Sequence, residues 1–160
     1  MRIGEIAVLG PGHEEKQLFI QAVCGRLELT NENITFGRFP INDQLVLHLY
    51  GVALQSESPA VAWDLLAKKC LGYIVLFPWQ DAGSFERLKP VLDILAAQYE
   101  AAMIVAVHVP EGDRPVPPAL FENGISVTAA GKLMFCDIRQ PAGARKVLLA
   151  LIESLLDKIS

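Results

Sequence analysis

The stretch IGEIAVLGPGHEEKQLF, residues 3–19, gives the first indication of the fold. Residues 3–9 make a short apolar run, which predicts a strand that ends at Gly10. From Glu15 to Gly25 apolar residues return at helical spacing, which predicts a helix. A strand, a glycine-containing loop and a helix in this order are typical of the start of an α/β domain.

The rest of the chain alternates between strand-like and helix-like segments. Two apolar runs separated by Asn42-Asp43 predict a β-hairpin. Continuous apolar runs predict strands buried on both faces, and amphipathic segments predict helices. The predicted strands after the first are residues 34–41, 44–50, 71–77, 101–109 and 132–138, and the later predicted helices are residues 59–70, 85–99 and 142–159, with a short helical turn near Ala119. We therefore expect one α/β domain over residues 1–160, with a mostly parallel six-stranded sheet covered on both sides and one antiparallel edge strand.

The composition of the chain indicates which kinds of binding partner and which cellular compartment to expect. The chain has 52% hydrophobic residues and a net charge of -4, which argues against disorder and against nucleic-acid binding through a basic surface. Cys24, Cys70 and Cys136 lie far apart without a C-x-x-C pair, so neither a zinc site nor a disulfide framework is indicated. The N-terminal apolar run is interrupted by Glu5 and is too short for an export signal or a membrane span. We expect a cytoplasmic protein with no membrane span.

The octapeptide GPGHEEKQ, which begins at Gly10, has nearly the form of a phosphate-binding loop. Read against G-x-x-x-x-G-K-[ST], Gly10 and Lys16 match, whereas Glu15 replaces the second glycine and Gln17 replaces the hydroxyl residue. A carboxylate at this place opposes a polyphosphate, because one like-charge pair at 4 Å costs about 4 kcal/mol at an effective dielectric of 20. Glu14 and Glu15 also suit the positive end of a helix dipole, so a turn without any ligand is the competing interpretation.

Longer segments of the sequence carry a resemblance to a known family. TFGRFPINDQLVLHLYG, residues 35–51, is followed by Gln55, Trp63-Asp64 and LGYIVLF. Together with the element order, these segments resemble the bacterial Ras-like small GTPases related to the gliding-motility GTPase MglA. The resemblance implies a three-layer P-loop small-GTPase-like fold. The residues on that scaffold are Phe36, Gly37, Arg38, Leu47, Leu49, Tyr50, Gly51, Gln55, Trp63, Asp64 and Gly72.

The resemblance also implies where a nucleotide site would lie, and the chain departs from each of its motifs. Gln55 would orient an attacking water, but Leu54 replaces the glycine that precedes it in the family. His108 and Glu111 stand at the first and last positions of the guanine-specificity motif N-K-x-D. Glu111 keeps an acidic side chain at the place of the aspartate, and the asparagine and lysine are missing. The residues of the degenerate nucleotide site are Gly10, Pro11, Gly12, His13, Glu14, Glu15, Lys16, Gln17, His108, Glu111, Cys136 and Asp137.

Two functions follow from these departures. The leading hypothesis is a pseudo-GTPase that works as a protein-interaction or scaffold module, with no catalytic residue and no cofactor. The alternative is a divergent GTP-binding protein with weak GTPase activity, in which Lys16 holds GTP or GDP with magnesium and Gln55 serves hydrolysis. The magnesium-binding threonine would then be Thr30 or Thr35, and the sequence does not choose between them.

The sequence also indicates which partners and metals to expect. By resemblance, the candidate partners are roadblock-type proteins, with a second copy of the chain as a further candidate. The three histidines, His13, His48 and His108, fall on separate segments, so we expect no metal site among them.

Overall fold

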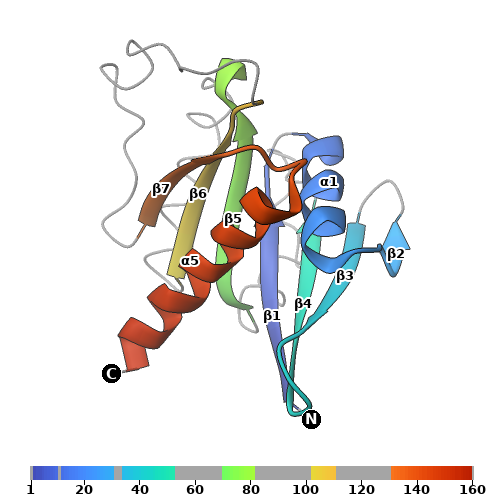
Figure 1. Ribbon diagram of the computed structural model, residues 1–160, viewed down its shortest axis with the longest axis vertical. Coiled ribbons are helices and arrows are strands. Elements are labelled where there is room, and N and C mark those ends of the chain that lie inside the picture. The colour runs from blue at the N-terminus through green and yellow to red at the C-terminus, as the bar shows by residue number, and fades with distance from the viewer. Residues whose placement is uncertain are drawn as a thin grey trace, which may run out of the picture.

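The computed structural model describes residues 2–10, 12–30, 34–52, 70–81, 102–110 and 131–159. These residues include seven strands in one sheet, in the order β2-β3-β4-β1-β5-β6-β7 (Figure 1). The strands are β1 (Arg2–Leu9), β2 (Leu29–Thr30), β3 (Ile34–Pro40), β4 (Leu45–Val52), β5 (Cys70–Pro78), β6 (Ala102–His108) and β7 (Gly131–Cys136). Within the same ranges the helices are α1 (His13–Cys24) and α5 (Pro141–Ile159), and the 3-10 turn η1 (Trp79–Asp81) follows β5.

The sheet is mostly parallel, as predicted. The central strand β1 pairs in parallel with β4 on one side and with β5 on the other, and β6 and β7 continue in parallel beyond β5. At the opposite edge, β3 runs antiparallel to β4 and to β2. An α/β fold with a mostly parallel sheet and an antiparallel edge is therefore confirmed.

The predicted count of six strands is wrong, because Leu29 and Thr30 form the additional strand β2. They pair with Phe36 and Thr35 of β3. Residues 27–33 look like a polar loop in the sequence, since a strand of two residues is too short to show an alternating pattern.

The hairpin between β3 and β4 is confirmed, and the side chain of Asn42 forms its turn. Its Oδ1 accepts hydrogen bonds from the backbone N–H groups of Gln44 at 2.7 Å and Leu45 at 2.9 Å. Asn can therefore make this turn without the glycine that two-residue hairpin loops usually contain, since its side chain mimics a backbone turn.

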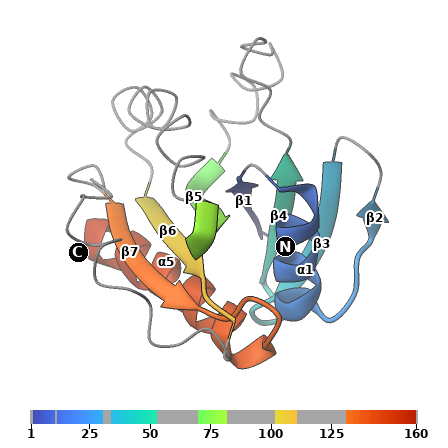
Figure 2. The ribbon, with the colours of Figure 1, turned by 90° about the horizontal axis from the view of Figure 1, so that it is seen from above.

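Helices α1 and α5 pack on the same face of the sheet (Figures 1 and 2). They enclose a core with the inward side chains of the four central strands. This core includes Ile6, Val8, Phe19, Ile20, Leu49, Ile74, Ile104, Val147 and Leu151. The alternate strand residues, among them Ala7, Val75 and Val105, are also fully buried, so both faces of the central strands are covered, as parallel sheets require.

Two predicted helices fall largely or wholly outside the described residues. They are residues 59–70 and 85–99, and the turn near Ala119 also falls there. Cys70, predicted as the last residue of the first of these helices, instead begins β5. Of the helices in the described ranges, neither α1 nor α5 is long and apolar enough to cross a membrane.

Candidate functional site

The candidate site lies where the carboxyl ends of β1, β6 and β7 meet the loops that follow them. Ligands of open α/β sheets bind at this edge. His108 and Cys136 end adjacent strands and are register partners. Burial lowers the pKa of His108, whereas the charges of Asp137 and, more weakly, Glu15 raise it. Glu15 in the first turn of α1 and Asp137 directly after β7 therefore both act on the pKa of His108.

Gly10 has a structural role that needs no ligand. A Cβ at this position would fall on the backbone carbonyl oxygen of Leu76 in the neighbouring strand β5. Only glycine allows β1 and β5 to approach this closely where β1 ends. The first match to the phosphate-loop pattern is thus explained by packing alone.

Lys16 turns back into the loop instead of lying on the helix surface. The residue is only 2% exposed, and its Nζ donates a hydrogen bond of 3.1 Å to the carbonyl oxygen of Gly10. Burial lowers the pKa of Lys16 to about 8, and the charge of Glu15 acts in the opposite direction. An ammonium group held inside the loop is the arrangement expected of a phosphate-binding lysine.

Glu15 occupies the positive end of α1. Gly12 is the N-cap, with an extended backbone at φ -99° and ψ 127° and no side-chain cap. A Cβ on Gly12 would coincide with a carboxylate oxygen of Glu15, so this carboxylate folds back over the N-cap. Acidic residues at the third helical position do this in a capping box. The chain thereby places its own anion at the helix end where an anionic ligand would bind.

Gln17 and Thr30 bond to each other. The Nε2 of Gln17 donates to the Oγ1 of Thr30 at 2.7 Å. Thr30 is the register partner of Thr35, a buried residue of β3 whose hydroxyl has no hydrogen-bond partner among the described residues. Because magnesium requires oxygen ligands, an amide NH₂ directed at the threonine hydroxyl does not fit a magnesium site.

No metal cluster forms in the part of the chain that the structure describes. His13 lies in α1, His48 in β4 and His108 in β6, and no three His, Cys, Asp or Glu side chains gather within these ranges.

Asp137 lies in the loop that would face the guanine base in the predicted site, and its carboxylate is paired with Arg139. Its Oδ1 accepts from the backbone N–H of Arg139 at 3.0 Å and from its Nε at 3.1 Å, and its Oδ2 accepts from Nη2 at 3.1 Å. The Nδ1 of His108 lies 3.9 Å from this carboxylate and accepts the N–H of Ile138 at 3.2 Å. A carboxylate that is paired with arginine in this bidentate way is poorly placed to accept hydrogen bonds from a guanine base.

Arg139 belongs to this group although the sequence motifs did not predict it. Its position two residues after Asp137, on a turn, is the signal that could have revealed it. Pro11, Gln55 and Glu111, which belong to the predicted site, lie outside the described residues.

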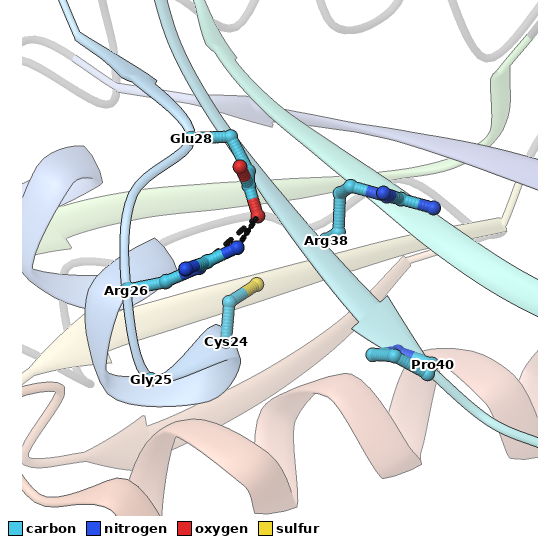
Figure 3. A pocket seen from close by; sticks show the side chains of 6 residues that line it. All are labelled: Cys24, Gly25, Arg26, Glu28, Arg38 and Pro40. Atoms are coloured by element: carbon cyan, nitrogen blue, oxygen red, sulfur yellow. Dashed lines mark hydrogen bonds and ion pairs between the residues drawn. The ribbon is translucent and has the colours of Figure 1, made fainter.

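A separate groove of about 440 Å³ opens at the C-terminal end of α1. Figure 3 shows the ion pair between Arg26 and Glu28 on one side of it and the thiol of Cys24 between that pair and Pro40. Burial, together with the charge of Glu28, raises the pKa of Cys24 to about 11. This thiol is therefore protonated near neutral pH and is a poor nucleophile.

The chain matches no protein-family model, and no curated protein is significantly similar to it. The resemblance to Ras-like GTPases therefore stays a prediction from the sequence.

Proposed function

We propose that this protein is a pseudo-GTPase, a Ras-like P-loop domain of three layers that acts in the cytoplasm as a protein-interaction or scaffold module. The observation that carries the proposal is the carboxylate of Glu15 folded over Gly12 at the start of α1. The order of the strands and the loop between β1 and α1 support the choice of fold.

The energetic basis is repulsion at the helix N-terminus. A phosphate 4 Å from the Glu15 carboxylate would be disfavoured by about 4 kcal/mol at an effective dielectric of 20. This energy corresponds to a loss of roughly three orders of magnitude in affinity. Glu15 is half-buried, so salt screens the repulsion incompletely. A nucleotide would have to displace this carboxylate from Gly12 before its phosphates could reach the backbone N–H groups.

The other parts of the predicted site support the same conclusion. Gln17, which replaces the hydroxyl residue of the phosphate-loop pattern, is hydrogen-bonded to Thr30, one of the two candidate magnesium-binding threonines. Asp137, in the loop expected to face the base, is paired with Arg139. Each of these pairs would have to open before it could contact a nucleotide, which adds to the cost of binding.

The second candidate is a divergent GTP-binding protein with weak GTPase activity. Lys16 favours it, because its ammonium group lies inside the loop beside Gly10. If the loop binds GTP through this lysine, Lys16→Ala abolishes binding, and the wild-type protein releases phosphate faster than the buffer blank does. The pseudo-GTPase predicts no such release.

Titration calorimetry with GTP, GDP and ATP in the presence of magnesium tests the proposal. We expect no dissociation constant below about 1 mM for the wild-type protein. Binding at micromolar concentration or tighter would contradict the proposal and favour the second candidate.

A matched pair of variants tests the role of Glu15. We expect Glu15→Gln to tighten the binding of magnesium-GTP by about tenfold or more, since it removes the opposing charge. Glu14→Gln removes an exposed carboxylate from the same helical turn and should have little effect. Equal effects of the two substitutions would show that Glu15 does not close the loop.

A partner experiment tests the interaction role. The resemblance implies roadblock-type proteins as partners, and a purified member of that group is the first protein to measure by calorimetry. A pseudo-GTPase binds its partner equally well with and without magnesium-GTP. A requirement for nucleotide would favour the second candidate.

A further inference from the structure

The outer face of α5 carries two exposed leucines. The inner face of the helix is in the core through Ala144, Val147 and Leu151, all fully buried. On the other side, Leu149 is 56% exposed and Leu156 is 60% exposed. Figure 1 shows α5 lying across one face of the sheet. Isolated exposed leucines are common, so the residues around them decide whether this face has a role.

The outer face has a symmetric pattern centred on Leu149. Arg145 lies four residues before Leu149, and Glu153 lies four residues after it. Ala142 and Leu156 lie seven residues away on the two sides. At about 100° per residue, all five positions fall within a band about 80° wide on the helix surface. Lys146 follows Arg145 in the sequence and lies about 20° outside this band, on the side of Glu153.

This pattern is complementary to itself when a second copy of α5 is laid against it in the antiparallel direction. A two-fold axis at Leu149 brings Leu149 of the two copies together. It sets Arg145 level with Glu153 of the second copy, about 6 Å from the axis at 1.5 Å per residue, with Lys146 about 4.5 Å from the axis. Ala142 then faces Leu156 of the second copy. An isologous contact of this kind satisfies both copies at once and closes as a dimer.

The charges at this face are available for such a contact. Arg145, Lys146 and Glu153 are all exposed. No ion pair joins any of them to another residue in the described ranges. A parallel arrangement of two copies would instead set Arg145 beside Arg145, which like-charge repulsion disfavours.

We propose that the outer face of α5 is a self-association surface through which two copies of this chain form an antiparallel, two-fold symmetric dimer. Leu149 lies at the centre of the contact, and the basic pair Arg145 and Lys146 contacts Glu153 of the second copy on each side. The proposal does not depend on the state of the nucleotide loop, which lies at the carboxyl edge of the sheet.

Sedimentation equilibrium of the full chain tests the proposal. We expect the wild-type protein to dimerise and Leu149→Glu to be monomeric over the same concentrations. Leu29→Glu is the matched control, since Leu29 is 49% exposed on β2, and this variant should keep the dimer. A wild-type protein that stays monomeric up to about 1 mM, or a Leu149→Glu variant that still dimerises, would overturn the proposal.

Charge reversal tests the pairing itself. We expect Glu153→Lys to weaken the dimer by about tenfold or more, because two attractive contacts become repulsive. The triple variant Arg145→Glu, Lys146→Glu and Glu153→Lys restores opposite charges and should recover the wild-type dissociation constant. Failure of the triple variant to recover dimerisation, with a helical circular dichroism spectrum like that of the wild type, would contradict the antiparallel register.

Cross-linking supplies an independent measurement. Residues on a two-fold axis between packed helices can lie within disulfide range, so Leu149→Cys should form a covalent dimer under mild oxidation. Leu29→Cys, which lies far from the axis, should not. Equal cross-linking of the two variants would indicate random collision and would overturn the proposed surface.

Discussion

Replacing Lys16 with methionine tests whether this side chain is held inside the loop. Burial lowers its pKa from 10.5 to about 8, with Glu15 acting in the opposite direction. Between these two pH values the unfolded chain binds more protons than the folded chain, so the contribution of Lys16 to the free energy of unfolding rises with pH. The gap between 10.5 and about 8 corresponds to about 3 kcal/mol. Relaxation of the loop and penetration of water reduce the cost of burying the charge, so we expect a rise of about 1–3 kcal/mol.

Urea unfolding of the wild type and Lys16→Met from pH 7 to 10.5 measures this contribution. The free energy of unfolding of the variant minus that of the wild type should fall by about 1–3 kcal/mol across the range. Comparing the two proteins cancels the opposite contribution of Cys24, whose pKa burial raises to about 11. Lys146→Met, at an exposed position of α5, should show no such trend. A difference between Lys16→Met and wild type that does not vary with pH would refute the burial of a charged lysine.

Three further substitutions test the local structure by the same unfolding assay. Gly10→Ala should destabilise the protein by about 2 kcal/mol or more, because the added Cβ meets the carbonyl oxygen of Leu76; a loss below about 0.5 kcal/mol would mean that β1 and β5 separate easily. Asn42→Ala should cost about 1 kcal/mol through the loss of two hydrogen bonds in the hairpin turn, and no loss would show that the turn forms without them. Asp137→Asn should cost about 1–3 kcal/mol, since it removes the charge that pairs with Arg139, and an unchanged midpoint would contradict the importance of that pair.

Most of the described fold could be predicted from the sequence. The strand at residues 3–9 is an apolar run that ends at a glycine, and the first and final helices have apolar residues at helical spacing. The structure has all three within two residues of the predicted ends. Strand β2 and the start of β5 at Cys70 could not be predicted from such patterns. Strand β2 has only two residues, and Cys70 joins β5 because its pairing with Glu5 of β1 outweighs the helical pattern before it.

The candidate site could be predicted only in part. The motif positions placed Gly10 and Lys16 in one loop, and the structure joins them by a hydrogen bond. Sequence spacing does not give the direction of a side chain, so the return of Glu15 over Gly12 could not be deduced. The bond between Gln17 and Thr30 depends on the fold as well, since it joins a helix to an edge strand thirteen residues away.

The electron density of the loop in crystals soaked with magnesium-GTP tests whether Glu15 closes the nucleotide site. We expect a loop without nucleotide, with the Glu15 carboxylate over Gly12 and the Nζ of Lys16 about 3.1 Å from the carbonyl oxygen of Gly10. Density for a triphosphate and its metal ion in the loop, with Glu15 turned outward and Lys16 on the phosphates, would contradict this expectation.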